Sequence, residues 1–173
     1  RSSDLWASLD VLSNGRTRLV ACAGGGAGPL WEAESAAMNV APGERRKRMV
    51  ENMHVLRHLW TKDNEPFEGQ FTKFANVTLE PKPIQNPCPI WLATNAERLS
   101  KGQADSGGSD FALTRVGKIA DGWMTHSVSP EGFRKSWEFV LQAGRDAGRG
   151  GCLASVLGAM LLIFVGRMLG WHF

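Results

Sequence analysis

Short apolar runs alternate with longer segments of helical periodicity along most of this chain. Three short runs end in small or polar residues, as buried strands do: Arg18–Ala23, Ile90–Ala93 and Trp123–Thr125. Elsewhere apolar residues recur every three or four positions, which predicts amphipathic helices over Leu5–Leu12, Glu44–Thr61, Phe111–Ala120 and Pro130–Ala147. This alternation predicts an α/β fold, in which parallel strands are joined by crossover helices.

Turn and breaker residues separate these elements. Asn14 and Gly15 tolerate positive φ angles and predict the end of the first helix. The segment Glu65–Leu79 carries phenylalanines without helical spacing, which predicts a short hairpin. Four prolines within Pro81–Pro89 exclude a helix there and predict an extended approach to the next strand. The polar, glycine-rich segment Lys101–Asp110 predicts a surface loop.

The composition is that of an ordinary soluble globular protein, with 43% apolar and 21% charged residues. The net charge is +3, but basic and acidic residues are interspersed, so no basic stripe indicates nucleic-acid binding. Cys22, Cys88 and Cys152 lie far apart and form no CxxC pair, so neither a zinc site nor a disulfide framework is indicated. We therefore expect a metal-free protein of the reducing cytoplasm.

The two ends of the chain depart from this pattern. Residue 1 is an arginine. The first residues do not show a charged segment followed by an apolar one, so they do not predict a signal peptide. We expect a domain over residues 1–149 and an apolar tail over residues 150–173. The uncharged run Cys152–Gly166 has 15 residues, fewer than the ~20 that a membrane-spanning helix needs. A buried helix or a non-native tail is therefore favoured over a membrane anchor.

Two strand ends carry groups that could hold a ligand. The glycines of Gly24–Gly28 follow a strand and could let backbone N–H groups approach a phosphate or a flat ring, although a flexible turn has the same composition. Thr94 and Asn95 follow the next strand, where ligands bind in parallel α/β folds. Their hydroxyl and amide groups could bond a phosphate, or could cap a following helix.

The histidines and one aspartate give weaker indications. His54 and His58 have the i, i+4 spacing of a zinc pair, but no glutamate follows the first, so a solvated helix face is favoured. His126 follows a strand and is a candidate acid or base, with a surface loop as the alternative. Asp121 precedes a glycine, and we expect a turn residue that needs no partner.

Five segments, in their order along the chain, resemble the bacterial luciferase-like monooxygenase family. They are LDVLSNGRTRLVACAGGG at residues 9–26, VLRHLWT at 55–61, FEGQFTKF at 67–74, LEPKPIQNPCPIWLATN at 79–95 and VGKIADGWM at 116–124. Each segment is weak by itself, but their joint order and spacing are specific. The resemblance extends from about Leu5 to Gly148, most of the chain.

The resemblance implies a (β/α)8 barrel that binds flavin mononucleotide (FMN) or, alternatively, a deazaflavin at the carboxyl ends of its strands. Cys22, Ala23 and Gly24 would lie near the cofactor ring. Backbone groups of Ala93–Asn95 and the Thr94 hydroxyl would contact the phosphate. The implied reaction oxidises a small organic substrate with reduced flavin and O₂, or moves hydride with a deazaflavin. We expect a small-molecule substrate, no nucleic-acid partner and a possible homodimer.

The chain also departs from the family pattern. It lacks the first barrel strands, its last part matches nothing expected there, and Lys101–Asp110 lengthens the loop beside the expected phosphate. We therefore expect a partial barrel and a fragment of a flavin-dependent oxidoreductase. The alternative is a non-catalytic barrel remnant or an interaction module without a complete cofactor site.

Overall fold

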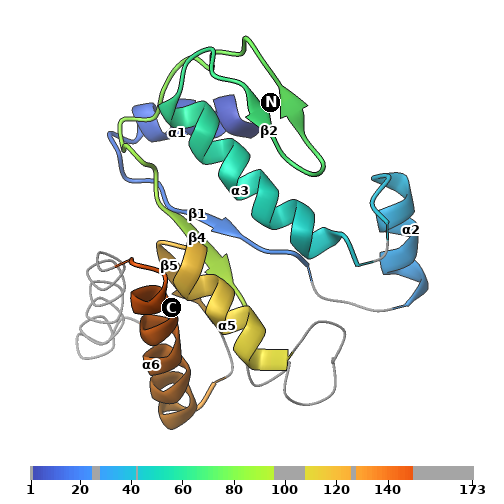
Figure 1. Ribbon diagram of the computed structural model, residues 1–173, viewed down its shortest axis with the longest axis vertical. Coiled ribbons are helices and arrows are strands. Elements are labelled where there is room, and N and C mark those ends of the chain that lie inside the picture. The colour runs from blue at the N-terminus through green and yellow to red at the C-terminus, as the bar shows by residue number, and fades with distance from the viewer. Residues whose placement is uncertain (1, 25–27, 42, 96–107, 126–127, 150–173) are drawn as a thin grey trace. The chain divides into compact units, whose positions relative to one another are not determined.

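The structure is a computed structural model, and it describes residues 2–24, 28–41, 43–95, 108–125 and 128–149 (Figure 1). The chain forms two compact units, Arg1–Pro89 and Ile90–Phe173, and each is described by itself. The expected tail at 150–173 and the candidate His126 lie outside the described residues. The described residues contain no helix long and apolar enough to cross a membrane.

The first unit contains the elements α1, β1, α2, α3, β2 and β3 in chain order. Their bounds are α1 Ser2–Leu12, β1 Leu19–Ala21, α2 Pro29–Ala37, α3 Arg45–Thr61, β2 Phe67–Glu68 and β3 Lys73–Phe74. The predicted first helix, first strand, long helix and hairpin are all present. Asn14 and Gly15 have φ angles of 55° and 72°, which confirms the turn that ends α1.

Two features of this unit differ from the expectation. The residues of β1 are half-buried, not buried. Helix α2 was not predicted, although Pro29 stands at the start of the helix, where its fixed φ and its lack of an N–H are tolerated. Because none of the residues of α2 is buried, it has no apolar stripe from which its helical period could be recognised.

A buried carboxylate ties the end of α1 to the proline-rich segment. Asp10 is 0% exposed and accepts hydrogen bonds from the Thr17 hydroxyl at 2.5 Å, the Gln85 backbone N–H at 3.0 Å and the Gln85 Nε2 at 2.7 Å. Cys88 is also 0% exposed, and its Sγ lies 3.7 Å from the Thr17 hydroxyl. Two segments far apart in sequence, both within the family resemblance, therefore meet through one polar cluster.

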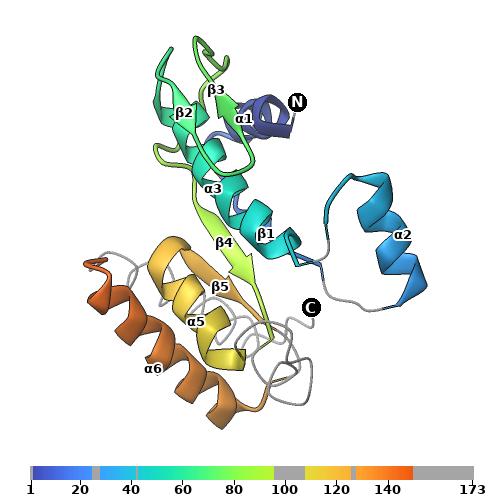
Figure 2. The same cartoon turned by 45° about the vertical axis from the view of Figure 1, so that its right-hand side comes forward.

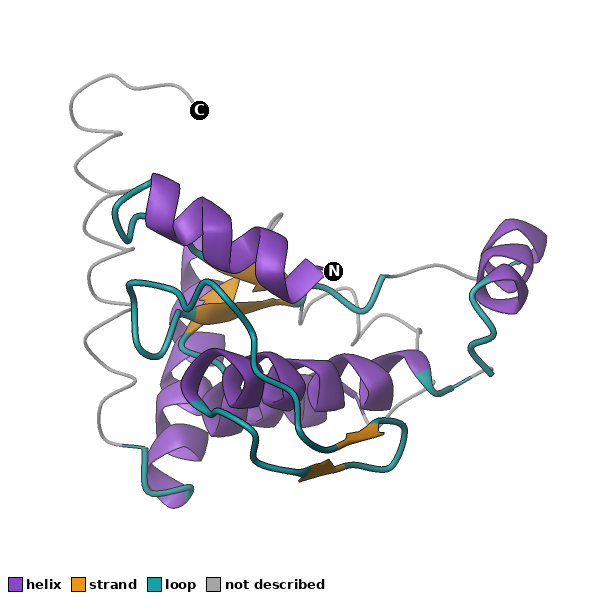
Figure 3. Ribbon diagram, turned by 90° about the horizontal axis from the view of Figure 1, so that it is seen from above, coloured by secondary structure: helices purple, strands orange, loops and turns teal. Residues whose placement is uncertain are grey.

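The hairpin of β2 and β3 packs against the side of helix α3 (Figure 3). Phe67 and Phe74 are paired across β2 and β3, and their rings stack with centroids 5.5 Å apart. The His58 ring meets both of them edge-on, at 5.4 and 5.7 Å, and its Nε2 lies 3.0 Å from the Glu65 carbonyl oxygen. The prediction of a solvated helix face is therefore wrong for His58, which packs on the hairpin. His54 is exposed, as that prediction states.

The second unit contains β4 (Ile90–Ala93), α5 (Gly108–Ile119), β5 (Gly122–Met124) and α6 (Pro130–Asp146). Strands β4 and β5 pair in parallel, with Trp91 opposite Gly122, which confirms the strand–helix–strand unit. Helix α5 begins at Gly108, so the last residues of the expected loop Lys101–Asp110 are helical. Residues 101–107 of that loop lie outside the described chain.

Helices α5 and α6 lie side by side (Figure 2) because a glycine allows close approach. A Cβ atom on Gly117 would overlap the Val140 carbonyl oxygen and lie 2.8 Å from the Gly144 nitrogen. Val116 and Val140 are 1% and 2% exposed, so this contact belongs to the core of the unit. At the start of α6, the Ser129 hydroxyl accepts the Gly132 N–H at 3.1 Å and caps the helix.

Candidate functional site

A groove of about 790 Å³ opens at the carboxyl end of β1. Its walls come from four parts of the first unit: the end of β1, α2, α3 and the hairpin. Apolar side chains form much of this lining: Trp31, Met38, Met49, Met53, Leu56 and Phe71. Its size and mixed lining are those of a small-molecule or cofactor site.

Cys22, Ala23 and Gly24, which the resemblance implied near a cofactor ring, all line this groove. Cys22 is exposed. Gly24 has a φ of +72°, and a Cβ atom there would lie 3.2 Å from Arg45 Nη1 and 3.3 Å from the Trp31 ring. A side chain at this position would be strained by the positive φ and would have to displace Arg45 or Trp31 slightly, so glycine is favoured.

Arg45 connects the α2 wall of the groove to the start of α3. Its Nε donates to the Ser35 hydroxyl at 2.9 Å, and its Nη2 pairs with Glu34 Oε2 at 2.7 Å. The same guanidinium lies 5.2 Å from the centre of the Trp31 ring, a cation–π distance. Sequence reasoning missed Arg45, since it is one of several charged residues in the predicted helix Glu44–Thr61.

Glu51 fixes the hairpin wall of the groove from the middle of α3. Its carboxylate accepts the Gln70 N–H at 2.6 Å and the Phe71 N–H at 3.0 Å. Burial alone would raise the pKa of Glu51, but these backbone hydrogen bonds outweigh it and hold the pKa below its ordinary value. Arg48, one turn earlier, lies over the Phe71 ring at 4.5 Å. The two charged side chains thus position the tip of the hairpin.

In the second unit, Ala93, Thr94 and Asn95 lie together at the carboxyl end of β4. The Thr94 N–H donates to the Met124 carbonyl at 3.0 Å, and the Thr94 carbonyl accepts the Trp123 indole N–H at 3.0 Å. Both the N–H and the carbonyl of Thr94 are therefore occupied by hydrogen bonds within this unit. Thr94 is half-buried, and its hydroxyl has no hydrogen-bond partner within the described chain, so the prediction that it binds a ligand stays open.

A buried hydroxyl directly after β5, Thr125 Oγ1, has no hydrogen-bond partner among the described residues. Ala93 is paired with Met124, so Thr94 and Thr125 each follow directly after neighbouring strands. A buried hydroxyl without a partner is unfavourable by roughly 1–3 kcal/mol, so this strand end suits a polar or anionic ligand group. Sequence reasoning missed Thr125, because only the burial of its hydroxyl after strand pairing makes it informative.

Asp121 is not the unpartnered turn residue that we expected. Its Oδ1 pairs with Arg149 Nη2 at 2.8 Å, and its Oδ2 accepts the Ile90 N–H at 2.9 Å. The expectation was wrong because Asp121, directly before β5, lies beside the backbone N–H of Ile90, the first residue of the neighbouring strand β4. Asp121 therefore supports the strand pair and leaves no free carboxylate for chemistry.

The six expected cofactor residues thus form two groups, one in each unit. Cys22, Ala23 and Gly24 line the groove of the first unit, and Ala93–Asn95 end β4 in the second. The groups present at both places suit a flavin-type cofactor: a broad groove beside a side-chain-free glycine for the ring, and threonine hydroxyls for the phosphate. The assignment of these residues to a cofactor remains a prediction.

Comparison with known proteins decides the family. The family described as luciferase-like monooxygenase matches residues 5–163 of this chain. The chain belongs to the luciferase-like monooxygenase family. The residues that carried the resemblance fall within this match.

The curated relatives of this luciferase-like chain include an uncharacterized protein of Mycobacterium tuberculosis, 29% identical over 120 residues, which are 69% of this chain and 36% of that protein. The FMNH(2)-dependent dimethylsulfone monooxygenase of Pseudomonas putida is 32% identical over 53% of this chain and 22% of its own length. The F420-dependent glucose-6-phosphate dehydrogenase of Amycolatopsis mediterranei is 30% identical over 63% of this chain and 32% of its own length. The chain spans at most about a third of these relatives.

Solved structures share the fold. The monooxygenase RslO1 from Streptomyces bottropensis is 27% identical with a TM-score of 0.58, covering 85% of this chain and 40% of RslO1. An F420-dependent secondary alcohol dehydrogenase is 18% identical with a TM-score of 0.65, covering 86% of this chain and 40% of that one. The second likeness concerns the fold alone. Together they confirm a mixed α/β fold of the kind found in luciferase-like enzymes.

Proposed function

We propose that this chain is part of an oxidoreductase that holds a flavin or deazaflavin at the carboxyl ends of its strands and acts on a small organic substrate. The observation that carries the proposal is family membership over residues 5–163, combined with a groove lined by Cys22–Gly24 at the end of β1. Relatives named for FMNH(2) and for F420 support both cofactor types. FMN is the first choice, and a deazaflavin is the alternative.

The residues of the chain would bind and orient the cofactor, which when bound supplies the electron or hydride transfer. Gly24 presents no side chain to the groove, so its backbone could approach the ring, and Trp31 with the other apolar side chains of the groove would pack against it. The hydroxyl of Thr94 would donate to the phosphate. No proton-transfer residue is assigned, because the only candidate, His126, lies outside the described residues.

The described elements would form part of a (β/α)8 barrel. Parallel pairing of β4 and β5, with α5 between them in sequence, supports this, since a barrel repeats that unit. We further propose a cytoplasmic location and a possible homodimer, which composition and family resemblance favour.

A second candidate is an interaction module without catalysis, and α1 favours it. Leu5, Leu9 and Leu12 recur along one side of α1 and are 70%, 47% and 83% exposed. An exposed apolar stripe of this kind is typical of a surface that pairs with another protein. Sedimentation of the full chain over a range of concentrations tests this candidate, which requires self-association that Leu5→Ser with Leu12→Ser abolishes.

Titration of the full chain with FMN, and separately with a deazaflavin, tests the main proposal through quenching of cofactor fluorescence. We expect saturable quenching with at least one of them. Absence of saturable quenching with both would refute the proposal, whatever the result of the sedimentation experiment.

Matched variants localise the binding. Gly24→Ala should weaken quenching, whereas Gly148→Ala should not, although both glycines have a φ of +72° and only Gly24 lines the groove. Thr94→Val should weaken binding of FMN more than binding of riboflavin, which lacks the phosphate. Thr114→Val on α5 is its control, and equal effects of the two threonine variants would contradict the assignment.

A further inference from the structure

Helix α2 forms one wall of the groove without belonging to a packed core. None of its residues is buried, and Leu30, at its start, is 81% exposed. Met38, directly after it, is 71% exposed. Most helices in proteins are stabilised by tertiary packing of an apolar face, and a helix as short as α2 is marginal in isolation. Something other than apolar packing must therefore hold α2 in place.

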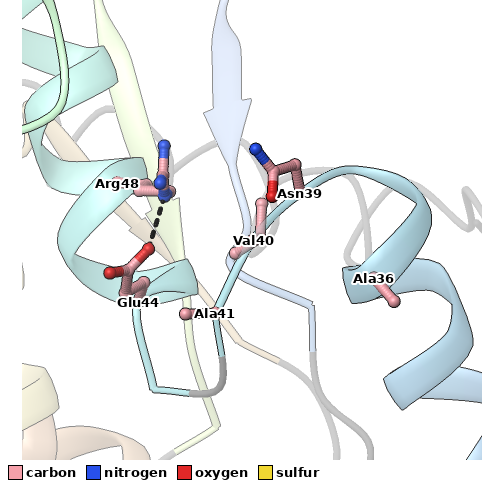
Figure 4. Close-up of a pocket in the computed structure, with 6 residues that line it drawn as sticks. All are labelled: Ala36, Asn39, Val40, Ala41, Glu44 and Arg48. Carbon is pink, nitrogen blue, oxygen red and sulfur yellow. Dashed lines mark hydrogen bonds and ion pairs between the residues drawn. The ribbon is translucent and has the colours of Figure 1, made fainter.

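Two hollows lie beside α2, and Figure 4 shows the first of them. A hollow of about 450 Å³ separates its last turn from the start of α3, lined by Ala36, Asn39, Val40, Ala41, Glu44 and Arg48. The groove at the end of β1 lies against Trp31, Glu34 and Ser35. A helix with hollows on two sides can change position without breaking a close-packed interface.

Arg45 supplies the polar attachment. The Arg45 guanidinium bonds three groups of α2: Glu34 Oε2, Ser35 Oγ and the Trp31 carbonyl, at 2.7, 2.9 and 3.4 Å. The Arg45 side chain is 28% exposed. One residue therefore joins α2 to α3 through a planar fork of donors, a geometry that lysine cannot reproduce.

Glycines flank the helix on both sides. Gly28, its N-cap, has a φ of +102°, and Gly43, before α3, has a φ of +81°. A Cβ atom at either position would meet no described atom within 4 Å. Backbone that is permissive and uncrowded can absorb the φ/ψ change of a hinge.

From these observations we propose that α2 is a hinged cover over the groove at the end of β1, and that Arg45 latches it closed. Closure places Trp31 against Gly24 and narrows the groove. Opening admits a ligand from the side of α2. The identity of that ligand as a small organic substrate rests on the proposed function, but the hinge and latch do not.

Hydrogen–deuterium exchange of the full chain without any cofactor tests the latch. Arg45→Ala should raise the exchange rate of the hydrogen-bonded α2 amides, residues 31–37, by about tenfold, since hydrogen bonds to charged groups are lost. Exchange in the middle of α3 and in the hairpin should stay unchanged. Arg45→Lys should give an intermediate rise, and Glu34→Gln a smaller one.

Lys47→Ala is the control, because Lys47 is a basic residue of the same helix that is exposed and lines neither hollow. It should leave α2 exchange as it is in the wild type. Unchanged α2 exchange in Arg45→Ala would overturn the proposal, and so would an equal rise in α3, which would make Arg45 a general stabiliser. Because no cofactor is present, these outcomes are independent of whether the chain binds a flavin.

Discussion

Replacing Asp10 by alanine should destabilise the first unit more than any surface substitution. Asp10 is fully buried and accepts hydrogen bonds from the Thr17 hydroxyl and from two Gln85 donors. Removing the carboxylate leaves these groups buried without their acceptor. Gln85 Nε2 keeps its bond to the Thr17 carbonyl at 2.9 Å, so the Gln85 backbone N–H and the Thr17 hydroxyl lose most.

The magnitude follows from those two donors. A buried donor left without a partner costs about 1–3 kcal/mol, so Asp10→Ala should lower the free energy of unfolding by about 3 kcal/mol. Asp10→Asn retains one carbonyl acceptor and should lose about half as much. Urea denaturation followed by circular dichroism measures both. Asp63→Ala, which removes an exposed ion pair to Lys82, is the control and should change stability by less than about 1 kcal/mol.

The pH dependence gives a second measurement on the same residue. Burial alone would raise the pKa of Asp10, but its hydrogen bonds from Gln85 and Thr17 outweigh it and hold the pKa below the ordinary value. The unfolded state therefore binds this proton more readily, so the stability from Asp10 is present above the unfolded pKa and is lost as pH falls through the folded pKa. Asp10→Asn should flatten this acid limb. If the free energy of unfolding of Asp10→Ala lies within about 0.5 kcal/mol of the wild-type value, the reasoning is refuted, because that difference is smaller than the cost of one donor without a partner.

Three further predictions concern other contacts. Gly117→Ala should destabilise the α5–α6 pair by about 1–3 kcal/mol in urea denaturation, since the added methyl overlaps backbone, and an unchanged midpoint would contradict this. Glu51→Gln should increase hydrogen exchange at the hairpin amides of Gln70 and Phe71, which lose charged acceptors, and equal rates would contradict it. In a Cys152→Ser variant, a thiol reagent should label the exposed Cys22 and leave Cys88 unlabelled. Burial of the Cys88 thiol blocks access of the reagent and raises the pKa of the thiol. Rapid labelling of both cysteines would contradict the burial of Cys88.

The periodicity of the sequence predicted most of the elements because tertiary packing follows it. The apolar spacing of residues 44–61 and 130–147 marks the faces that α3 and α6 bury. Helix α2 escaped prediction because it buries nothing, so no apolar stripe marks it. The same physical reason makes α2 the candidate for a moving part.

The sequence predicted candidate site residues only where their position along the chain was enough to identify them. Residues that follow strands, such as Cys22–Gly24 and Thr94, could be named because strand ends carry ligands in parallel folds. Arg45, Thr125 and the partnered Asp121 could not, because their roles depend on neighbours far away in sequence. His58 illustrates the same limit, since its aromatic partners come from the hairpin.

The central proposal is that a flavin-type cofactor binds at strand ends of this chain. Backbone amide chemical shifts of the isotope-labelled full chain, measured by NMR during titration with FMN or a deazaflavin, test it most directly. The account predicts saturable shifts concentrated at Cys22, Ala23 and Gly24 and at Thr94 and Asn95. Saturable shifts confined to other residues, or no shifts with either cofactor, would contradict it.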